Sequence, residues 1–333
     1  MPISPAFHRR AAIGFATAAL VPGARAQAPA VVGSNAPPNT PWEAQWTRFA
    51  QRAEAGGVPV SSMTAGQLGS DETILAALRR NRVQVGGFTL AAVTGVVPEL
   101  ALLTMPYLFA NEDEAAYVQD TVVGEIFAPL LRAQGLAYLQ LTASGWSGIY
   151  AKRPVRVPAD IKGRKFRSSP TLAHRAFLDA AGADVVPIGL ADVIPALETG
   201  LVDGGVMVLS YYGPAVSDAA KFFTRTRHYY EGGLVLANAG WFDRLGPAQQ
   251  AALRAAYDTP AESRAVVRAA EADILAKLAA KGATVIEPTP DEHAAWVAAT
   301  VSAADRLVRD IGGQAADVRA RLVAARDAYR AKR

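Results

Sequence analysis

The fold is decided by the stretch from Lys165 to Leu209, KFRSSPTLAHRAFLDAAGADVVPIGLADVIPALETGLVDGGVMVL. Short β-prone segments alternate in it with segments of helical periodicity. Gly200 follows the second helical segment in the position of a C-cap. The predicted order is strand Lys165–Arg167, helix Thr171–Ala181, strand Val185–Pro187, helix Ala191–Thr199 and strand Val206–Leu209. Such alternation is typical of an α/β lobe.

The same alternation extends to both sides of this stretch. Towards the N-terminus, Val58–Ser62 and Val83–Leu90 read as strands, with an amphipathic helical segment around Ile74, Leu75 and Leu78 between them. Further strands are predicted at Leu136–Leu141, Ile149–Ala151 and Leu234–Asn238, and the last of them can return the chain to the first lobe. The chain has 333 residues, which is more than one hydrophobic core normally supports, so we expect two lobes.

The C-terminal part is rich in alanine and helical in pattern. From Pro247 to Ala280 the helical pattern is interrupted at Thr259-Pro260, where Thr259 and Glu262 form a capping box with proline at the first helical position. The pattern fits two consecutive helices, or one long helix kinked at the proline. It favours a break or kink slightly. Asp291 is expected to cap the last helical region.

The segment Met1 to Ala26 has the parts of a secretory signal peptide. Arg9 and Arg10 precede an apolar run to Val21, and Ala24-Arg25-Ala26 forms a small-residue cleavage site. The apolar run is shorter than the roughly 20 residues that span a bilayer. We therefore expect residues 1–26 to be removed after export to the periplasm, by the general or the twin-arginine route.

Removal of this segment changes the charge of the chain. Of the 34 Lys and Arg residues, the segment holds three and no Asp or Glu, which leaves 31 basic against 30 acidic groups and a net charge of +1. No dense basic tract interleaved with aromatics is present. The sequence therefore gives no reason to expect nucleic-acid binding.

The residues that carry most enzyme chemistry are missing or scattered. There is no cysteine, and the four histidines show no metal-ligand spacing. Gly145-Trp146-Ser147-Gly148 lacks the G-x-S-x-G spacing of a nucleophile elbow, and no Walker or G-x-G-x-x-G motif occurs. We expect no catalysis, no metal site formed by the protein's own side chains and no cofactor.

Arg167 is the residue that best fits a binding role. It lies at the C-terminal end of a short strand, and ligands of open α/β sheets bind outside strand C-termini. An alternating strand points Lys165 and Arg167 to one side and Phe166 to the other. The planar guanidinium matches a carboxylate in two parallel hydrogen bonds. The alternative is a surface arginine on a basic loop.

Four motifs occur in order along the chain: Gly66–Ser70 (GQLGS), Met105–Phe109 (MPYLF), Asp160–Arg167 (DIKGRKFR) and Ala191–Gly204 (ADVIPALETGLVDG). Their order and spacing resemble a known family, the DctP-type solute-binding proteins of tripartite ATP-independent periplasmic (TRAP) transporters. The resemblance implies a two-lobed α/β periplasmic-binding-protein fold with a hinge, crossing strands and a long C-terminal helix. It implies that Arg167 pairs with a substrate carboxylate when the lobes close.

The resemblance also predicts the lobes and their boundaries. Lobe I is expected to contain residues 27–144 and about 233–275, and lobe II residues 145–232 and about 276–333. The expected function is capture of a small organic acid and its delivery, by transient contact, to the TRAP membrane permease. A related protein that senses or scavenges without a permease, or a periplasmic enzyme, is the alternative.

Several positions depart from the family pattern. Ser147, preceded by Trp146, stands where many members carry a second arginine, and Met207 stands in place of an asparagine. Leu190 replaces a common aromatic residue, and Thr89 ends a strand where relatives often have a polar or acidic residue. The predicted substrate-binding set is Arg167, Trp146, Ser147, Thr89, Leu190, Met207, Tyr211 and Tyr212. These changes favour a monocarboxylate with an apolar body. The individual acid, a bridging metal ion and the oligomeric state stay open.

Overall fold

The structure is a computed structural model that describes Met1, residues 28–36, Pro38 and residues 40–332. The expected signal peptide, residues 1–26, therefore lies outside the described residues except for Met1. The described strands are β1 (Ala30–Ser34), β2 (Val60–Met63), β3 (Val85–Thr89), β4 (Leu136–Ala151), β5 (Lys165–Ser168), β6 (Asp184–Pro187), β7 (Gly204–Val208), β8 (Phe222–Thr224), β9 (Tyr230–Asn238) and β10 (Thr284–Ile286).

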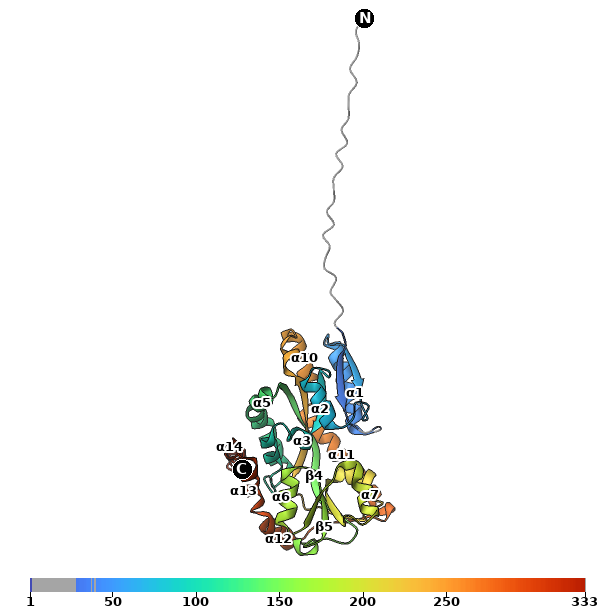
Figure 1. Ribbon diagram of the computed structural model, residues 1–333, viewed down its shortest axis with the longest axis vertical. Helices are drawn as coiled ribbons and strands as arrows, with labels where there is room; N and C mark the ends of the chain where they lie inside the picture. Colours follow the sequence, from blue (N-terminus) through green and yellow to red (C-terminus); the bar gives the residue numbers. More distant parts are fainter. Residues whose placement is uncertain (2–27, 37, 39, 333) are drawn as a thin grey trace.

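Helices cover the strands on both sides (Figure 1). The described α-helices are α1 (Pro41–Ala55), α2 (Asp71–Arg79), α3 (Leu90–Val93), α4 (Glu112–Val118), α5 (Gly124–Ala133), α6 (Leu172–Ala180), α7 (Val193–Glu198), α8 (Leu209–Tyr211), α9 (Ala239–Asp243), α10 (Pro247–Ala256), α11 (Pro260–Leu278), α12 (Pro290–Thr300), α13 (Ala303–Ile311) and α14 (Ala315–Arg330). Short 3-10 or π segments are η1 (Pro98–Thr104), η2 (Gln119–Val123), η3 (Pro158–Asp160), η4 (Leu190–Asp192), η5 (Tyr212–Val216) and η6 (Ala279–Lys281).

The strands form a sheet of two halves that share β4. The order is β2-β1-β3-β9-β4-β7-β5-β6, and β8 pairs with both β4 and β10. In the first half β1 runs parallel to β2 and β3; in the second half β5 runs parallel to β6 and β7. The long strands β4 and β9 are antiparallel to their neighbours, and β4 passes from one half to the other (Figure 1). The predicted α/β class is confirmed, with β4 as the strand that joins the two halves.

Strand β4 is longer than the sequence indicated. Two strands, Leu136–Leu141 and Ile149–Ala151, are predicted, yet the structure has one strand of 16 residues. The small residues and glycines between the two segments lowered the apparent strand propensity. Gly145, at a φ of +105°, accommodates a register shift against β9, and a Cβ at Gly148 would lie 2.5 Å from the Thr224 carbonyl oxygen. The glycines thus mark a bulge and a close backbone approach.

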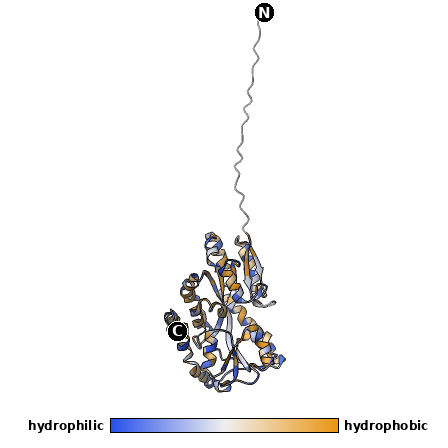
Figure 2. Cartoon of the chain, viewed as in Figure 1, coloured by the Kyte–Doolittle hydropathy of each residue, from blue (hydrophilic) through white to orange (hydrophobic). Residues whose placement is uncertain are grey.

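Each half of the sheet has a hydrophobic core on both faces. In the first half, Leu234 and Leu236 of β9 pack with α2, α4 and α5, whereas Val235 and Ala237 pack with α1 and α10. In the second half, Tyr150 and Met207 pack towards α7 and α11, and the neighbouring strand residues pack towards α6 and α12. This alternation follows from the two-residue period of a strand. Figure 2 shows apolar stretches of ribbon on both the strands and the helices.

Helices α10 and α11 are two consecutive helices, which is one of the two predicted alternatives, and not one kinked helix. Tyr257 and Thr259 are extended, and Pro260 opens α11 with the predicted capping box of Thr259 and Glu262. Proline disfavours a helical conformation at the residue before it, which explains the break. The break is held by Asp258, which accepts hydrogen bonds from Arg48 and Arg52 of α1.

The last helices pack against both halves. Helix α13 contacts α6 of the second half and η1 of the first, and α14 contacts α4 and η1. The buried residues of α14, Ala315, Val318 and Leu322, share a core with the first half. The end of the chain thus packs on elements within residues 27–144, whereas the expected lobe II includes residues up to 333. In the described part of the chain, no helix combines the length and the hydrophobicity needed to cross a membrane.

Candidate functional site

Arg167 lies where the sequence predicts it, near the end of β5 and between the parallel neighbours β6 and β7. Its Nε donates to the carbonyl oxygen of Ile188 at 2.9 Å, and its Nη1 to that of Val206 at 3.4 Å. The Ile188 carbonyl lies just beyond the C-terminal end of β6, and the Val206 carbonyl lies in the middle of β7. The guanidinium is therefore fixed at the strand-end edge of the second half, with only 5% of the residue exposed.

The guanidinium of Arg167 keeps donors to spare. It carries five N–H groups, and the two backbone carbonyls use two of them. Among the described residues, no Asp or Glu oxygen lies within 4 Å of its nitrogens. Burial lowers the pKa of Arg167, against the opposing influence of Tyr150 and Glu231. A buried cation of this kind is stabilised by an anion that accepts two hydrogen bonds, such as a carboxylate.

Further polar atoms around Arg167 have no partner of their own. The hydroxyls of Tyr150 and Ser168 are buried and make no hydrogen bond within the described structure. Tyr150, Gly205 and Arg167 are successive neighbours across β4, β7 and β5. Burial raises the pKa of Tyr150 to about 12, so its hydroxyl is a neutral donor at neutral pH. Unsatisfied buried polar groups are rare in native proteins and call for a ligand or an ordered water.

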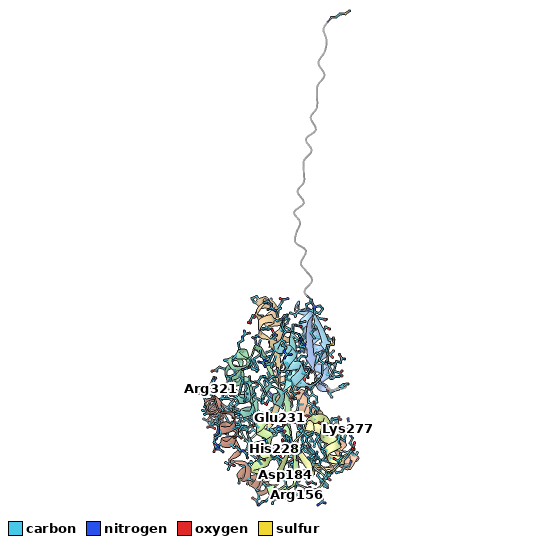
Figure 3. The ribbon with its side chains drawn as sticks, in the orientation of Figure 1. Arg156, Asp184, His228, Glu231, Lys277 and Arg321 are labelled. Atoms are coloured by element: carbon cyan, nitrogen blue, oxygen red, sulfur yellow. The ribbon has the colours of Figure 1, made fainter. Side chains whose placement is uncertain are left out.

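Glu231 lies near the centre of the molecule, on β9 where this strand pairs with β4 at Gly145 (Figure 3). Its carboxylate accepts a hydrogen bond from Ser147 Oγ, and His174 Nε2 lies 3.4 Å from it. The other ring nitrogen of His174 is 2.6 Å from Ser169 Oγ. Burial alone would raise the pKa of Glu231, but His174, Ser147 and Arg167 outweigh it and hold the pKa below its ordinary value. An ionised Glu231 therefore links the crossing strands to α6.

The first half contributes a polar group that sequence reasoning found only in part. Thr89, at the end of β3, donates its backbone N–H and its hydroxyl to Asp71 Oδ2, each at 3.0 Å. Asn35, just after β1, donates to Asp71 Oδ1 at 2.9 Å, and its own side-chain oxygen is buried without a partner. The signal for Asn35 and Asp71 was their place at a strand end and at a helix start.

Tyr211 connects the polar group of the first half with the second half. It follows β7 and stacks on Trp42 of α1, with ring centroids 5.6 Å apart and an interplanar angle of 24°. Burial raises the pKa of Tyr211, and the charge of Asp71 adds to the effect, which places the two side chains near each other. The two halves therefore meet beside Asp71 and Thr89.

The remaining predicted residues are not brought together in one place. Leu190 is 46% exposed, two residues beyond the Ile188 carbonyl that Arg167 contacts. Met207 is a core residue, Ser147 is buried under Glu231, and Trp146 is half-buried with its ring edge-on to Tyr230. Tyr212 does not fit the predicted role of a binding wall, because it is fully buried and its hydroxyl bonds to the Ala220 carbonyl.

The described residues form neither a nucleophile elbow at Ser147 nor a cluster of metal ligands. Ser147 lies within β4, not on a turn between a strand and a helix, so the geometry of a nucleophile elbow is absent there. In the part of the chain that the structure describes, no three His, Asp or Glu residues gather as possible metal ligands. The buried arginine with open donors is thus the chemical feature that distinguishes this region.

Comparison with known proteins supplies the family. Residues 32–310 match the family model of the bacterial extracellular solute-binding proteins, family 7, also called DctP. The chain belongs to this family. A solute-binding protein of Verminephrobacter eiseniae is 31% identical over 245 residues, 72% of this chain and 73% of that protein. The C4-dicarboxylate-binding periplasmic protein DctP of Rhodobacter capsulatus is 25% identical over 284 residues, 83% and 85% of the two chains.

Solved structures agree with the two-lobed architecture. The sugar acid binding protein of Advenella mimigardefordensis, in complex with galactonate, superposes with a TM-score of 0.82 at 24% identity and covers 90% of this chain and 97% of its own. The periplasmic ectoine-binding protein of the Halomonas elongata TRAP transporter has a TM-score of 0.83 at 19% identity, over 90% and 100% of the chains. The chain thus has the two-lobed fold of TRAP solute-binding proteins, a family of binding proteins and not of enzymes.

Proposed function

We propose that this protein captures a small organic acid in the periplasm and delivers it to a TRAP membrane permease. The observation that carries the proposal is Arg167, a buried guanidinium with unused donors and no carboxylate partner among the described residues. A carboxylate of the ligand would supply the counter-ion and accept two of the remaining N–H groups. The hydroxyls of Tyr150 and Ser168 would serve the same ligand.

We also propose that the two lobes close on the ligand. Asp71 and Asn35 lie on the first half of the sheet and Arg167 on the second, while Trp42 and Tyr211 touch across the boundary. A ligand that contacts both halves binds the closed arrangement better and shifts the population towards it. The permease would recognise that closed form. We propose export through the signal segment Met1 to Ala26 and a periplasmic location.

The chemistry of the ligand follows from these groups. The sequence favours an apolar body, and Trp42 and Tyr211 supply aromatic surface for one. Asp71 and Asn35 add acceptors that the sequence reading did not include. The proposed ligand is therefore a small acid whose carboxylate meets Arg167 and whose body contacts an aromatic wall. Relatives that bind galactonate or C4-dicarboxylates are compatible with this class.

The test uses the unmodified protein and a panel of organic acids in a thermal-shift screen, followed by calorimetry. At a hundredfold excess over Kd, a bound acid stabilises by about 2.7 kcal/mol. Arg167→Ala should abolish that stabilisation, and Arg167→Lys should weaken it because an ammonium cannot make the paired contact. Lys165→Ala, an exposed cation on the same strand, is the matched control. Normal binding by the Arg167→Ala protein would disprove the anchor.

A further inference from the structure

Helix α11 connects the two lobes and carries one half-buried acid, Glu271, near its middle. Near its start, Arg264 pairs with Asp120 and Arg268 with Glu112, both in the first half. Near its end, Ile274 lies against Gly213 of the second half, where a Cβ would approach it to 2.3 Å. Glu271 lies between these two anchored turns. It is thus placed where any change in the angle between the lobes must act.

Glu271 lies against the point at which β4 changes partner. Strand β4 pairs with β9 up to Trp146 and with β7 from Ser147 onward. The Glu271 carboxyl lies over the bulge at Gly145, since a Cβ there would be 2.3 Å from Oε1. Only glycine at that position leaves room for the acid. The carboxyl and the bulge are therefore packed against each other at the hinge.

The carboxyl of Glu271 is only partly satisfied in this arrangement, although a backbone hydrogen bond from Trp146 favours its ionised form. Its Oε1 is buried and has no hydrogen-bond partner within the described structure. It borders a cavity of about 10 Å³ that is also lined by Trp146, Ser147, Leu209, Phe223, Arg225 and Arg227. That volume is close to the lower limit for a single water. An ionised carboxylate with so little hydration is costly.

The charged groups around Glu271 do not offset the cost of ionising its buried carboxyl. Arg225 and Arg227, beyond β8, attract it, but both already pair with Glu287. Glu112 of α4 repels it, and Tyr230 of β9 is a neutral neighbour. Burial dominates and raises the pKa of Glu271 to about 7. The described arrangement thus holds a proton that a hydrated glutamate would release.

We propose that Glu271 is a proton-binding group of the hinge: its protonated form favours the arrangement in which the lobes touch, and its ionised form favours their separation. Opening the hinge admits water to the carboxyl and releases the proton. The ratio of separated to touching lobes should then rise with pH. The rise is up to about tenfold per pH unit between the pKa of Glu271 in the separated arrangement and its pKa in the touching arrangement. This inference concerns the hinge alone and does not depend on the identity of the ligand.

The distance between the lobes measures the effect directly. The chain has no cysteine, so Ala76→Cys on α2 and Glu198→Cys on α7, both exposed, can be spin-labelled specifically. Pulsed electron–electron double resonance would record the distribution of distances between the two spin labels from pH 5.5 to 8.5 without ligand. We expect the longer-distance population to grow as the pH rises from 5.5 towards the pKa of about 7, and to change little at higher pH, where Glu271 is ionised in both arrangements.

Two variants in the labelled background complete the test. Glu271→Gln mimics the protonated acid and should keep the low-pH distribution at every pH. Asp273→Asn removes an exposed carboxylate of the same helix, paired only with Lys277, and should titrate as the wild type does. Circular dichroism confirms that each variant folds. A wild-type distribution that does not change with pH, or a Glu271→Gln protein that titrates normally, would overturn the proposal.

Discussion

Trp42 of α1 stacks on Tyr211 of α8 at a centroid distance of 5.6 Å, and this contact joins the two halves of the sheet. Neither ring is fully buried, so the contact can form and break without opening a core. It lies beside Asp71, whose charge acts on Tyr211. The contact that holds the two halves together therefore lies next to Asp71 and Thr89, the polar group of the first half.

Removal of this ring contact should shift the lobes apart. Tyr211→Ala is expected to increase the radius of gyration of the ligand-free protein in small-angle scattering. Aromatic pairs contribute about 0.5–1.5 kcal/mol, so binding of an acid identified in the screen should weaken by roughly 2- to 10-fold. Tyr211→Phe keeps the ring and serves as the control. An unchanged affinity for the alanine variant would show that the stack plays no part in closure.

Tyr150→Phe should separate stability from binding. The Tyr150 hydroxyl is buried without a partner, and such a group costs on the order of 1–3 kcal/mol. Its removal should therefore leave the free energy of unfolding unchanged or raise it, while affinity for the acid falls. Chemical denaturation and calorimetry measure the two quantities. A loss of stability would show that the hydroxyl bonds to a structural water and not to a ligand.

Asp71→Asn tests the group contributed by the first half. The change keeps the size of the side chain but removes the charge and one of its two acceptor oxygens, of which Oδ1 accepts from Asn35 and Oδ2 from Thr89. We expect affinity to fall by about 1–2 kcal/mol, with little change in the unfolding transition. Glu72→Gln, the exposed neighbour on α2, should bind as the wild type does. Equal affinities of all three proteins would place Asp71 outside the binding site.

Asp258 should make stability depend on acid pH. The hydrogen bond from Arg48 is the main cause that holds the pKa of Asp258 below its ordinary value, with Arg52 assisting against burial. A lowered pKa means that the stabilisation is present above about pH 4 and is lost as pH falls through the folded-state pKa. Asp258→Asn should cost about 1–2 kcal/mol at pH 7, a figure reduced because both arginines are more than a third exposed.

The comparison of wild type and Asp258→Asn by chemical denaturation at pH 7 and pH 3 checks this sign. The difference in unfolding free energy should shrink at the lower pH. Asp243→Asn, which breaks an exposed pair with Arg132, is the matched control and should cost only a few tenths of a kcal/mol. A difference that grows towards low pH would contradict the assignment.

Local patterns predicted much of the fold. The predicted helix Thr171–Ala181, the break before Pro260 and the predicted strand Lys165–Arg167 depend on near neighbours in the chain. The structure has all three, with α6 at Leu172–Ala180 and β5 extended by one residue to Ser168. The continuous β4 was missed because its middle is stabilised by pairing with distant strands. Packing of α14 on α4 is likewise non-local, and sequence patterns carry no record of it.

The candidate site divides in the same way. Arg167 was predicted from its strand position and residue type together with the family resemblance, because position and type alone also fit a surface arginine. Asp71 and Asn35 meet only after β1 and α2 have packed, so no spacing in the chain reveals them. Tyr211 and Tyr212 are adjacent, yet one lies at the boundary of the lobes and the other in the core. Helical rotation between consecutive residues separates them by about 100°, a phase that the sequence pattern left undetermined.

The uninterrupted β4 has a consequence for how the molecule comes apart. Because one strand supplies hydrogen bonds to both sheet halves, neither half keeps a complete sheet when the other melts. Neither lobe can then be excised as a self-sufficient folding unit. Denaturation should proceed as a single cooperative transition of the whole chain, with a denaturant dependence set by its full buried surface.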